Sequence, residues 1–506
     1  MYKIVSAEEM RCLEERCFAS GAASSVELMQ IAGRGCAELA YQFLRTLPAC
    51  RRIVVFAGSG NNGGDGVVIA DTLARKQDLP VVLALAKPGK LSESSAHFFA
   101  RLDKRVEVVA AGDVVLSQSD LVVDALLGIG CSSPMREPYA GLIKAINDSQ
   151  AAVLAVDLPS GLGTDCCVKA HLTAVIGFFK DVLFTAQGIE NAGLLRLVEL
   201  PQLYDFAPAG MVGEAASGAW YRANLVPFPR SVHKYQRGSV VIAGGSQEYF
   251  QAPFLSARAA LRGGAGIVRL ALPFAPAPGS GTLSVIPTSL PAESGALGGQ
   301  AFEILTAYLD KAAVLAIGPG MGRSRAAECF VQKAIQTDKI LIIDADAVVL
   351  TAGLTDLLRQ RQAQTILTPH RGEARALAAG LDITLTGNDI EDAVNLARSA
   401  RSVILLKGAR TVCAEPGGRY VVNTSGTPAL ATAGSGDVLT GLLAARAAAN
   451  PEGDMLAAAA QAAFLHGMAG ELGSMIYGES GVIADDLPEL AAQAAMRLSR
   501  RSDIFD

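Results

Sequence analysis

The sequence lacks the features that mark several large classes of protein. Its formal net charge is −5, so it has no basic excess that would attract nucleic acid or an anionic membrane. It contains no uninterrupted run of about 18 apolar residues, the length that a membrane span needs. Acidic residues, Glu8 and Glu9, stand where a signal peptide needs an apolar run. We therefore expect a cytoplasmic protein with neither a nucleic-acid nor a membrane partner.

The nine cysteines lack the CxxC spacing of zinc sites and dithiol redox centres. Their number is odd, and Cys166 and Cys167 are adjacent. We interpret all nine as reduced thiols, which agrees with a cytoplasmic location.

Apolar residues and glycine are abundant. Hydrophobic residues make up 50% of the chain, charged residues 18%, and there are 52 glycines, which is typical of an α/β enzyme rich in tight turns. A chain of 506 residues exceeds the size of a single core, so we expect two domains, residues 1–210 and 220–506. The stretch 201–219, rich in Pro, Gly, Ala and Ser, is the predicted linker.

In the first domain, strands and helices alternate. Helices are expected at 7–18 and 25–44. Short apolar strands are expected at 52–57, 81–86, 106–109, 121–124, 153–157 and 194–200. This βαβ pattern predicts a Rossmann-like parallel sheet.

The second domain repeats the alternation, and its strands are expected at 240–243, 267–272, 314–317, 340–344, 365–367 and 403–407. The stretch 273–299 holds many prolines and glycines and predicts a long surface loop. The alanine-rich stretch 443–469 predicts a core helix. The second domain is therefore also α/β.

A glycine-broken turn at 434–437 is the most informative motif of the second domain. Gly434 and Gly436 let the backbone approach a ligand, and the free N–H groups of the following helix favour a phosphate. A carboxylate in such a turn, Asp437, repels a phosphate unless it acts as a base or holds a metal ion, which indicates phosphoryl chemistry. The alternative is a helix cap with glycines for the turn.

The first domain carries a GxGxxG pattern at Gly58, Gly60 and Gly63, after a strand and before a helix. The acidic residue that a dehydrogenase uses to bind ribose is missing after the second strand, so a simple dehydrogenase is disfavoured. The loop instead carries Asn61, Asn62 and Asp65.

Asp124 and Asp157 end two predicted strands of the first domain, and Ser160 follows closely. Oxygen ligands of this kind suit a hard cation at the carboxyl edge of the sheet. The alternative is that each aspartate caps the next element.

Three further strand ends of the second domain carry polar residues. Asp344 and Asp346 follow one strand, His370 follows the next, and Lys407 ends another beside a glycine turn. Lys407 is placed to contact a nucleotide phosphate, although a solvated lysine is the alternative. His370 is poorly explained by packing, whereas His466, on an alanine-rich helix, is interpreted as a core histidine.

Together these motifs resemble the bifunctional NAD(P)H-hydrate repair enzymes, which fuse an N-terminal epimerase domain to a C-terminal ADP-dependent dehydratase of ribokinase-like fold. The matching strings are 58–66, 123–128 and 156–161 in the first half, and 233–234, 243–246, 318–322, 344–346, 367–370, 407–411 and 434–437 in the second. The resemblance assigns residues 1–210 to the epimerase domain and 220–506 to the dehydratase domain.

The resemblance implies that the protein interconverts the R and S hydrates, NADHX and NADPHX, and dehydrates the S form with ADP, releasing AMP and phosphate. It implies Asp437 as the base of dehydration and Asp157 as a proton-transfer residue of epimerisation, with Lys180 as a second candidate. Potassium in the epimerase domain, Mg²⁺ with the nucleotide and a homo-oligomer are also expected.

The resemblance also assigns the binding residues. Potassium would be held by Asn62, Asp124 and Ser160. The nucleotide would be bound by Lys407, Gly408, Ala409, Arg410, Thr411 and Gly436. The hydrated dinucleotide would contact Ala252, Gly320 and His370 in the second domain, and Asn61, Asn62, Gly63, Gly64, Asp65, Gly128, Ile129, Gly130, Cys131, Ser132, Ser133 and Pro134 in the first.

Two other functions remain open at this stage. Ribokinase-like kinases share the turn at 434–437, so a vitamin-type small-molecule kinase fused to a nucleotide-binding domain is one alternative. A dehydratase whose N-terminal domain is a non-catalytic nucleotide sensor is the other. The products formed from hydrated NADH would separate these functions.

Overall fold

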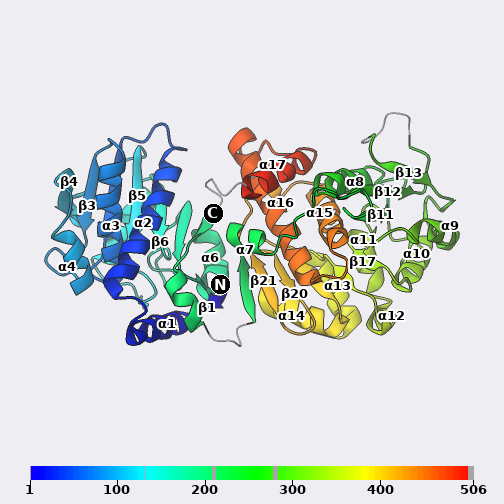
Figure 1. The fold of residues 1–506 in the computed structure, drawn as a ribbon, viewed down its shortest axis with the longest axis horizontal. Helices are drawn as coiled ribbons and strands as arrows, with labels where there is room; N and C mark the ends of the chain where they lie inside the picture. The colour runs from blue at the N-terminus through cyan, green and yellow to red at the C-terminus, as the bar shows by residue number, and fades with distance from the viewer. Residues whose placement is uncertain (1, 132, 208–211, 277–282, 500–506) are drawn as a thin grey trace. The chain divides into compact units, whose positions relative to one another are not determined.

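The structure, a computed structural model, describes residues 2–131, 133–207, 212–276 and 283–499. It divides into two compact units, within Met1–Met211 and within Val212–Arg501. Each unit is an α/β structure around its own sheet, so the predicted fold class is confirmed (Figure 1). Among the described residues, no helix has the length and apolar character needed to cross a membrane.

The N-terminal unit contains a seven-stranded sheet in which all neighbouring strands are parallel. Its order is β4-β3-β2-β5-β6-β7-β9. The strands are β2 (Arg52–Ala57), β3 (Val81–Leu85), β4 (Val106–Ala110), β5 (Asp120–Ala125), β6 (Ala152–Val156), β7 (Leu172–Ile176) and β9 (Leu194–Val198). A separate pair joins β1 (Ile4–Val5) to β8 (Phe179–Lys180).

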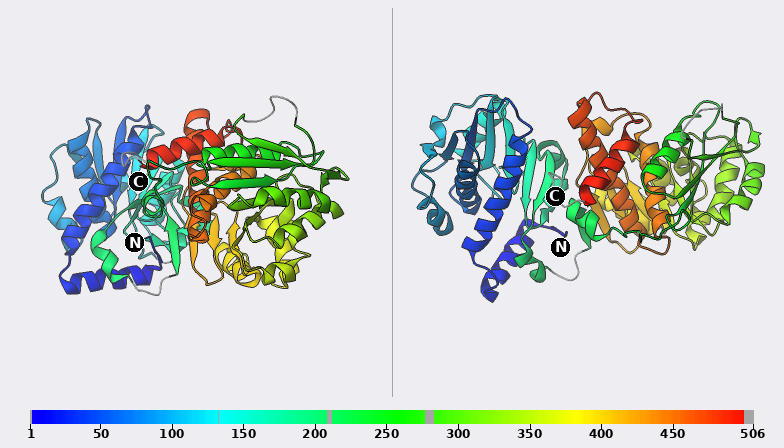
Figure 2. Two further views of the ribbon diagram at one scale, coloured as in Figure 1. Left: turned by 45° about the vertical axis from the view of Figure 1, so that its right-hand side comes forward. Right: turned by 45° about the horizontal axis from the view of Figure 1, so that its top comes forward.

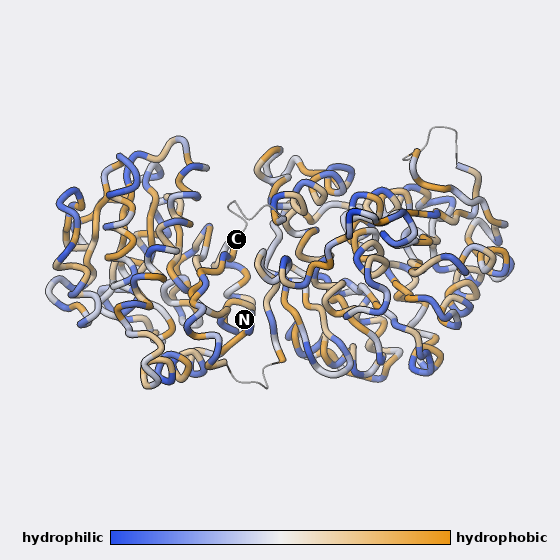
Figure 3. The backbone as a smooth tube through the Cα atoms, viewed as in Figure 1, coloured by the Kyte–Doolittle hydropathy of each residue, from blue (hydrophilic) through white to orange (hydrophobic). Residues whose placement is uncertain are grey.

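Helices cover both faces of this sheet, because the strands are apolar on both sides. On β2, Ile53 and Val55 pack into one core cluster while Val54 and Phe56 pack into the other. Figure 3 shows the strands hydrophobic along much of their length. The helices are α1 (Ala7–Ser20), α2 (Ser25–Leu44), α3 (Asn61–Lys76), α4 (Glu93–Phe99), α5 (Tyr139–Asp148) and α6 (Ala186–Asn191).

The C-terminal unit contains a ten-stranded sheet of order β10-β21-β20-β19-β18-β17-β16-β11-β12-β13. Its neighbours are parallel except that β20 runs antiparallel to both β19 and β21. The strands are β10 (Gly213–Ala216), β11 (Ser239–Ala243), β12 (Ile267–Leu272), β13 (Ile286–Ser289), β16 (Val314–Ile317), β17 (Ile340–Ile343), β18 (Thr365–Leu367), β19 (Val403–Leu406), β20 (Val412–Ala414) and β21 (Tyr420–Asn423). A small hairpin joins β14 (Ala292–Glu293) to β15 (Ala296–Leu297).

The helices of this unit form two layers (Figures 1 and 2). On one face α8 (Ala252–Arg262), α15 (Ser435–Ala449), α16 (Met455–Tyr477) and α17 (Leu487–Ser499) pack against one another. The other helices are α7 (Gly218–Ala223), α9 (Gly299–Leu309), α10 (Arg325–Ile335), α11 (Ala345–Thr351), α12 (Thr355–Gln360), α13 (Arg371–Leu381) and α14 (Asp389–Ala400). Helix α15 is buried on nearly every side, which its alanine-rich sequence permits.

The prediction of a linker at 201–219 is wrong over much of that stretch. Residues Gly213–Ala216 form β10, which pairs with β21 at the edge of the second sheet, and α7 begins at Gly218. Small residues mimic a loop in the sequence, but backbone pairing and burial make this segment a strand. Residues 208–211 lie outside the described part of the chain.

Two other predictions need correction. The expected surface loop at 273–299 contains the edge strand β13 and the β14–β15 hairpin, while 277–282 lie outside the described residues. The alanine-rich stretch 443–469 is divided between α15 and α16, because Pro451 and Gly453 interrupt the chain and Asp454 caps the second helix.

Candidate active sites

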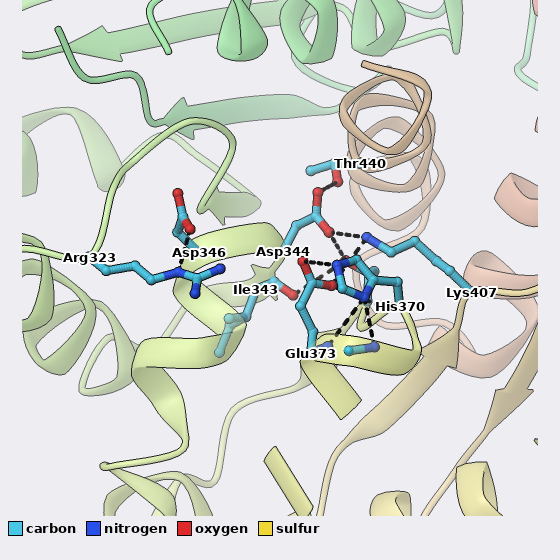
Figure 4. A network of polar contacts seen from close by, with 10 residues as sticks. Arg323, Ile343, Asp344, Asp346, His370, Glu373, Lys407 and Thr440 are labelled. Atoms are coloured by element: carbon cyan, nitrogen blue, oxygen red, sulfur yellow. Dashed lines mark hydrogen bonds and ion pairs between the residues drawn. The ribbon is translucent and has the colours of Figure 1, made fainter. Parts of the chain in front are cut away.

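Four side chains from four elements of the C-terminal unit meet in one buried cluster, the Asp344 cluster: Asp344, Thr368, Lys407 and Thr440. Asp344 follows β17, and its side chain is 2% exposed. Its Oδ1 accepts hydrogen bonds from Thr368 Oγ1 at 2.6 Å and from Lys407 Nζ at 2.8 Å. Its Oδ2 accepts one from Thr440 Oγ1 at 2.6 Å (Figure 4). Both carboxylate oxygens therefore accept hydrogen bonds, three in total.

Lys407 carries its positive charge at the carboxyl edge of the sheet. Burial pulls its pKa down, but the carboxylates of Asp344 and Glu373 raise it above the ordinary value overall. Glu373 Oε2 lies 3.6 Å from Lys407 Nζ. A Cβ placed on Gly436 would lie 3.6 Å from the same nitrogen, so the ammonium group is next to the first turn of α15. An anion at this helix start would meet both the helix N–H groups and Lys407.

Asp437 lies in that first turn, as the motif predicts. Gly434 has φ 88°, a conformation that favours glycine, and helix α15 begins at the next residue. Burial, together with Asp344 and other nearby acids, raises the pKa of Asp437 to about 7, although Lys407 opposes the change. A carboxyl group with such a pKa is suited to accept a proton near neutral pH.

The predicted substrate residues Ala252 and Gly320 are neighbours, because a Cβ on Gly320 would lie 3.2 Å from Ala252 Cβ. Gly320 has φ 61°. Ser256, on the same helix as Ala252, donates a hydrogen bond from Oγ to the backbone oxygen of Asp437 at 2.8 Å. Helix α8 therefore links these two residues to the turn that carries Asp437.

His370 has a structural role that the sequence did not reveal, although the role is helix capping and not packing. His370 is the N-cap of α13, and its Nδ1 accepts hydrogen bonds from the N–H groups of Gly372 at 2.9 Å and Glu373 at 3.2 Å. Because Nδ1 is an acceptor, the ring proton belongs on Nε2, which lies 3.2 Å from Glu373 Oε1. The ring is 59% exposed, so a substrate contact remains a prediction.

The predicted nucleotide segment 407–411 forms a tight turn after β19, with Thr411 Oγ1 donating to the carbonyl of Gly408 at 3.2 Å. Arg410 is buried and donates from Nη1 to the carbonyl of Thr424 at 2.7 Å. Its guanidinium group therefore fixes the turn from inside, and a contact between Arg410 or Ala409 and a nucleotide stays a prediction. His466 is a buried core histidine as predicted, with Nε2 3.1 Å from Ser435 Oγ.

In the N-terminal unit, the glycine loop packs tightly between β2 and α3. A Cβ on Gly58 would lie 1.9 Å from the carbonyl oxygen of Leu126, and one on Gly63 would lie 1.9 Å from that of Gly58. Asn61 is exposed at the start of α3, and a Cβ on Gly64 would meet Met29 and Ser95 side chains at 2.5 Å. The glycines are therefore needed for close approach of backbone segments.

Asp124 and Ser160, two of the predicted potassium ligands, are in direct contact. Ser160 donates from Oγ at 2.6 Å and from its backbone N at 2.8 Å to the Asp124 carboxylate. Burial raises the pKa of Asp124 to about 6, although these hydrogen bonds oppose the change. The third ligand, Asn62, lies against Gly128, and its amide nitrogen is buried without a hydrogen-bond partner among the described residues.

Asp157 and Lys180 form a buried ion pair with 2.5 Å between Nζ and Oδ1. Asp157 has φ 67°, which is unusual for a residue with a side chain. Lys180 also donates to the carbonyl of Ile176 at 2.7 Å and is 1% exposed. Burial and the negative charge of Asp157 raise the pKa of Asp65, and burial raises that of Glu14.

The predicted substrate loop 128–134 is tied to its surroundings by contacts that the motifs do not reveal. Arg11 of α1 donates from Nη2 to the carbonyl of Ile129 at 2.9 Å. Ser133 Oγ donates to Asp165 Oδ1 at 3.0 Å, and Cys131 Sγ lies 3.3 Å from the carbonyl of Gly128. Gly130 and Pro134 belong to the same loop, whereas Ser132 lies outside the described residues.

Sequence reasoning missed Glu14, Arg11, Asp165 and Thr440. Arg11 and Glu14 sit on a helix far from the motifs in sequence, so no local pattern marks them. Thr440 lies one turn after Asp437 on α15, and that spacing alone would have placed it on the same face of the helix.

Comparison with known protein families gives two matches. Residues 240–492 match a family described as NAD(P)H-hydrate dehydratase, and residues 25–182 match one described as YjeF-related protein N-terminus. The chain is 33% identical to the bifunctional NAD(P)H-hydrate repair enzyme of Moorella thermoacetica, over 96% of this chain and 95% of that one. It is 35% identical to the enzyme of the same name from Salinibacter ruber, over 93% and 92% of the two chains.

Among solved structures, the chain is similar to an ADP/ATP-dependent NAD(P)H-hydrate dehydratase from Bacillus subtilis co-crystallized with ATP and Mg²⁺. The identity is 23%, and the match covers 56% of this chain and 97% of that one with a TM-score of 0.43.

Proposed function

Because the chain belongs to the family of bifunctional NAD(P)H-hydrate repair enzymes, we propose that its two units carry out two successive reactions on hydrated nicotinamide cofactors. The N-terminal unit, residues 1–210, interconverts the R and S hydrates. The C-terminal unit, which lies within Val212–Arg501, dehydrates the S form to NADH or NADPH with ADP, releasing AMP and phosphate.

Dehydration starts at the C6 hydroxyl of the hydrated ring. Asp437 takes the proton of that hydroxyl, whose oxygen then forms a bond to the terminal phosphorus of ADP while AMP leaves. Phosphate then leaves C6 as the neighbouring ring carbon loses a proton, which restores the ring double bond. Ala252, Gly320 and His370 hold the dinucleotide during these steps.

The observation that carries this mechanism is the position of Lys407 beside the first turn of α15, the turn that contains Asp437. The lysine charge and the helix N–H groups oppose the negative charge that develops on the transferring phosphoryl group. Lys407, Gly408, Ala409, Arg410, Thr411 and Gly436 form the proposed nucleotide site. The Asp437 pKa of about 7 supports its role as the base.

Epimerisation is assigned to Asp157, with Lys180 as its partner. Inversion at C6 requires a bond to that carbon to break and reform, which needs a proton to move on or off the hydroxyl oxygen. The ion pair with Lys180 fixes the Asp157 carboxylate in one orientation. The first turn of α3, residues 61–65, and the loop at 128–134 bind the substrate beside it.

The residues assigned to potassium fit a cation held by oxygen. Asp124 and Ser160 supply carboxylate and hydroxyl oxygens, and the orphaned amide of Asn62 supplies a carbonyl oxygen when the amide is turned over. A bound potassium ion would add positive charge beside the substrate loops. Mg²⁺ is proposed to enter with the phosphates of the nucleotide.

We also propose three further properties of the protein. The protein is expected to assemble as a homo-oligomer, to accept both NADHX and NADPHX, and to work in the cytoplasm. The nine free cysteines support the last of these.

The test supplies the whole chain with a mixture of R and S hydrated NADH, ADP, Mg²⁺ and potassium. We expect complete recovery of the absorbance of reduced nicotinamide, with one AMP and one phosphate formed per NADH. Recovery that stops at the S fraction, after correction for spontaneous epimerisation, would identify a non-catalytic N-terminal unit. A stable phosphorylated product without NADH would instead identify a small-molecule kinase.

A further inference from the structure

The Asp344 carboxylate joins parts of the C-terminal unit that are far apart in sequence. Its partners come from the ends of β18 and β19 and from α15, so a single buried side chain connects three strand ends with one helix. The three donors occupy both carboxylate oxygens. Burial raises the pKa of Asp344, but Lys407 and the two hydroxyl groups outweigh burial and hold it below the ordinary value.

Thr440 connects this cluster to the helix that carries the proposed base, Asp437. Residues three apart in a helix share a face, so Thr440 lies one turn beyond Asp437 on α15. The bond from Thr440 to Asp344 therefore fixes the rotation and height of the first helical turn relative to β17. Figure 4 shows Thr440 and Lys407 approaching the Asp344 carboxylate from different sides.

Lys407 depends on the same carboxylate for its position. A lysine side chain has four rotatable bonds, and a free ammonium group at a strand end would turn toward solvent. The bond to Asp344 Oδ1 at 2.8 Å holds it beside Gly436. The backbone is also fixed, because Lys407 N–H donates to the carbonyl of Pro369 at 2.8 Å.

We propose that Asp344 is a positioning residue for dehydration: its buried carboxylate sets Lys407 and, through Thr440, the first turn of α15 in the arrangement that phosphoryl transfer requires. This inference rests on the proposed function of the C-terminal unit. Three hydrogen bonds hold Asp344 in its carboxylate form, so we assign it no role in proton transfer. It acts through Lys407 and Asp437.

The test compares Asp344→Asn with Thr440→Val in the whole chain. Asparagine keeps the shape but removes the charge, so we expect kcat for dehydration to fall by about 10- to 100-fold. Because the Asp344 charge raises the pKa of Asp437, the acid limb of the kcat profile should also move to lower pH by roughly one unit. Thr440→Val should lower kcat without moving this limb. Thr440→Ser keeps the hydroxyl group and should have the wild-type kcat.

Epimerisation by the same preparation controls for the amount of protein, and thermal unfolding controls for folding of the C-terminal unit, which is a separate compact unit. ADP binding measured by calorimetry is the readout that needs no catalysis. We expect Asp344→Asn to bind ADP more weakly, because Lys407 is no longer fixed. A wild-type chain that binds ADP but does not dehydrate would contradict the proposed function, while weaker ADP binding by Asp344→Asn would still support the positioning role.

Asp344→Asn with wild-type kcat and ADP binding would overturn the inference. A lowered kcat with an unmoved acid limb and unchanged ADP binding would also overturn it, since that is what a merely structural residue gives. If Asp344→Asn does not fold, Thr440→Val provides the test. A kcat for dehydration equal to that of the wild type in Thr440→Val would overturn the inference. A lower kcat in Thr440→Val that returns to the wild-type value in Thr440→Ser would support it.

Discussion

The two candidate sites lie at the carboxyl ends of parallel strands but differ in how their buried charged groups are paired. In the N-terminal unit Glu14, Asp65 and Asp157 all interact with Lys180, and burial raises the pKa of Glu14 and of Asp65. In the C-terminal unit Asp344 is neutralised by Lys407 and two hydroxyl groups, which hold its pKa down. In the first site, acids of raised pKa therefore surround the Asp157–Lys180 ion pair. In the second site, the acid of raised pKa is Asp437, and it lies beside a carboxylate that Lys407 neutralises.

This difference matches the chemistry proposed for each unit. A site in which burial raises the pKa of carboxyl groups suits proton movement, because such groups hold and release a proton at higher pH than ordinary carboxyl groups do. A fixed lysine at a helix start suits an anion, because both oppose the charge of a phosphoryl group. The comparison predicts that changes in one unit leave the reaction of the other unit intact.

The largest difference between the effects on the two reaction rates is expected for Asp437→Asn. Loss of the base should lower the dehydration rate by about a thousandfold, while R/S interconversion stays at the wild-type rate. The dehydration rate is followed by NADH formation from the S hydrate with ADP. Asp310→Asn, an exposed carboxylate at the end of α9, is the matched control and should leave both rates unchanged. Wild-type dehydration by Asp437→Asn would refute the assignment of the base.

The converse change is Asp157→Asn, which should lower the epimerisation rate by about a hundredfold and spare dehydration of the S hydrate. NMR of R/S exchange measures the first rate. The substitution also leaves Lys180 buried without its carboxylate partner, which is destabilising. The Asp157→Asn, Lys180→Met double variant removes both charges and separates lost stability from lost chemistry. Asp113→Asn, exposed beside β4, is the matched control.

The sequence predicted local features of both sites well. Strand β2 has the predicted bounds, and the glycine turn before α15 was recognisable because a φ of 88° at Gly434 favours glycine. Most apolar strands were predicted because burial on both faces makes them continuous hydrophobic runs. The buried strand β7 was missed, as were the short strands β20 and β21. The order of motifs along the chain was enough to indicate the family.

Features that depend on distant partners were not predictable in this way. Strands β10 and β13 are edge strands, and each is defined by its one neighbour rather than by its own composition. The approach of Arg11 to the carbonyl of Ile129 spans 118 residues of sequence. The three hydrogen bonds to Asp344 likewise form because four elements meet. The sequence of each element does not reveal that meeting.

A change of pH should lower kcat for dehydration by less than these substitutions lower the rates of their reactions. Because Asp437 acts as a base in its deprotonated form and its pKa is raised to about 7, kcat for dehydration should fall about tenfold per unit below that pH. An unperturbed aspartate would keep kcat constant down to a pH of about 4. Single-turnover dehydration between these limits, with a stability check at each pH, distinguishes the two. A flat profile would contradict the base assignment.

The smallest effect is expected from the cation in the N-terminal unit. Ser160→Ala removes the hydroxyl that donates to Asp124 and accepts from the N–H of Leu127 at 2.9 Å. If Asp124, Ser160 and Asn62 hold potassium, epimerisation by the wild type should drop several-fold when tetramethylammonium replaces potassium, because the methyl groups of that ion keep oxygen ligands away from its charge.

Ser160→Ala should then be slow in either salt and insensitive to the exchange. Ser149→Ala should respond like the wild type, because its hydroxyl lies away from Asp124, donating to the carbonyl of Ile146 and accepting from the N–H of Ala151. Dehydration measured in parallel reports any general effect of the salt. An equal response of both units to the exchange would place the cation effect outside the Asp124 region. The contrast drawn between the units would then rest on their acid–base groups alone, because the cation would no longer distinguish them.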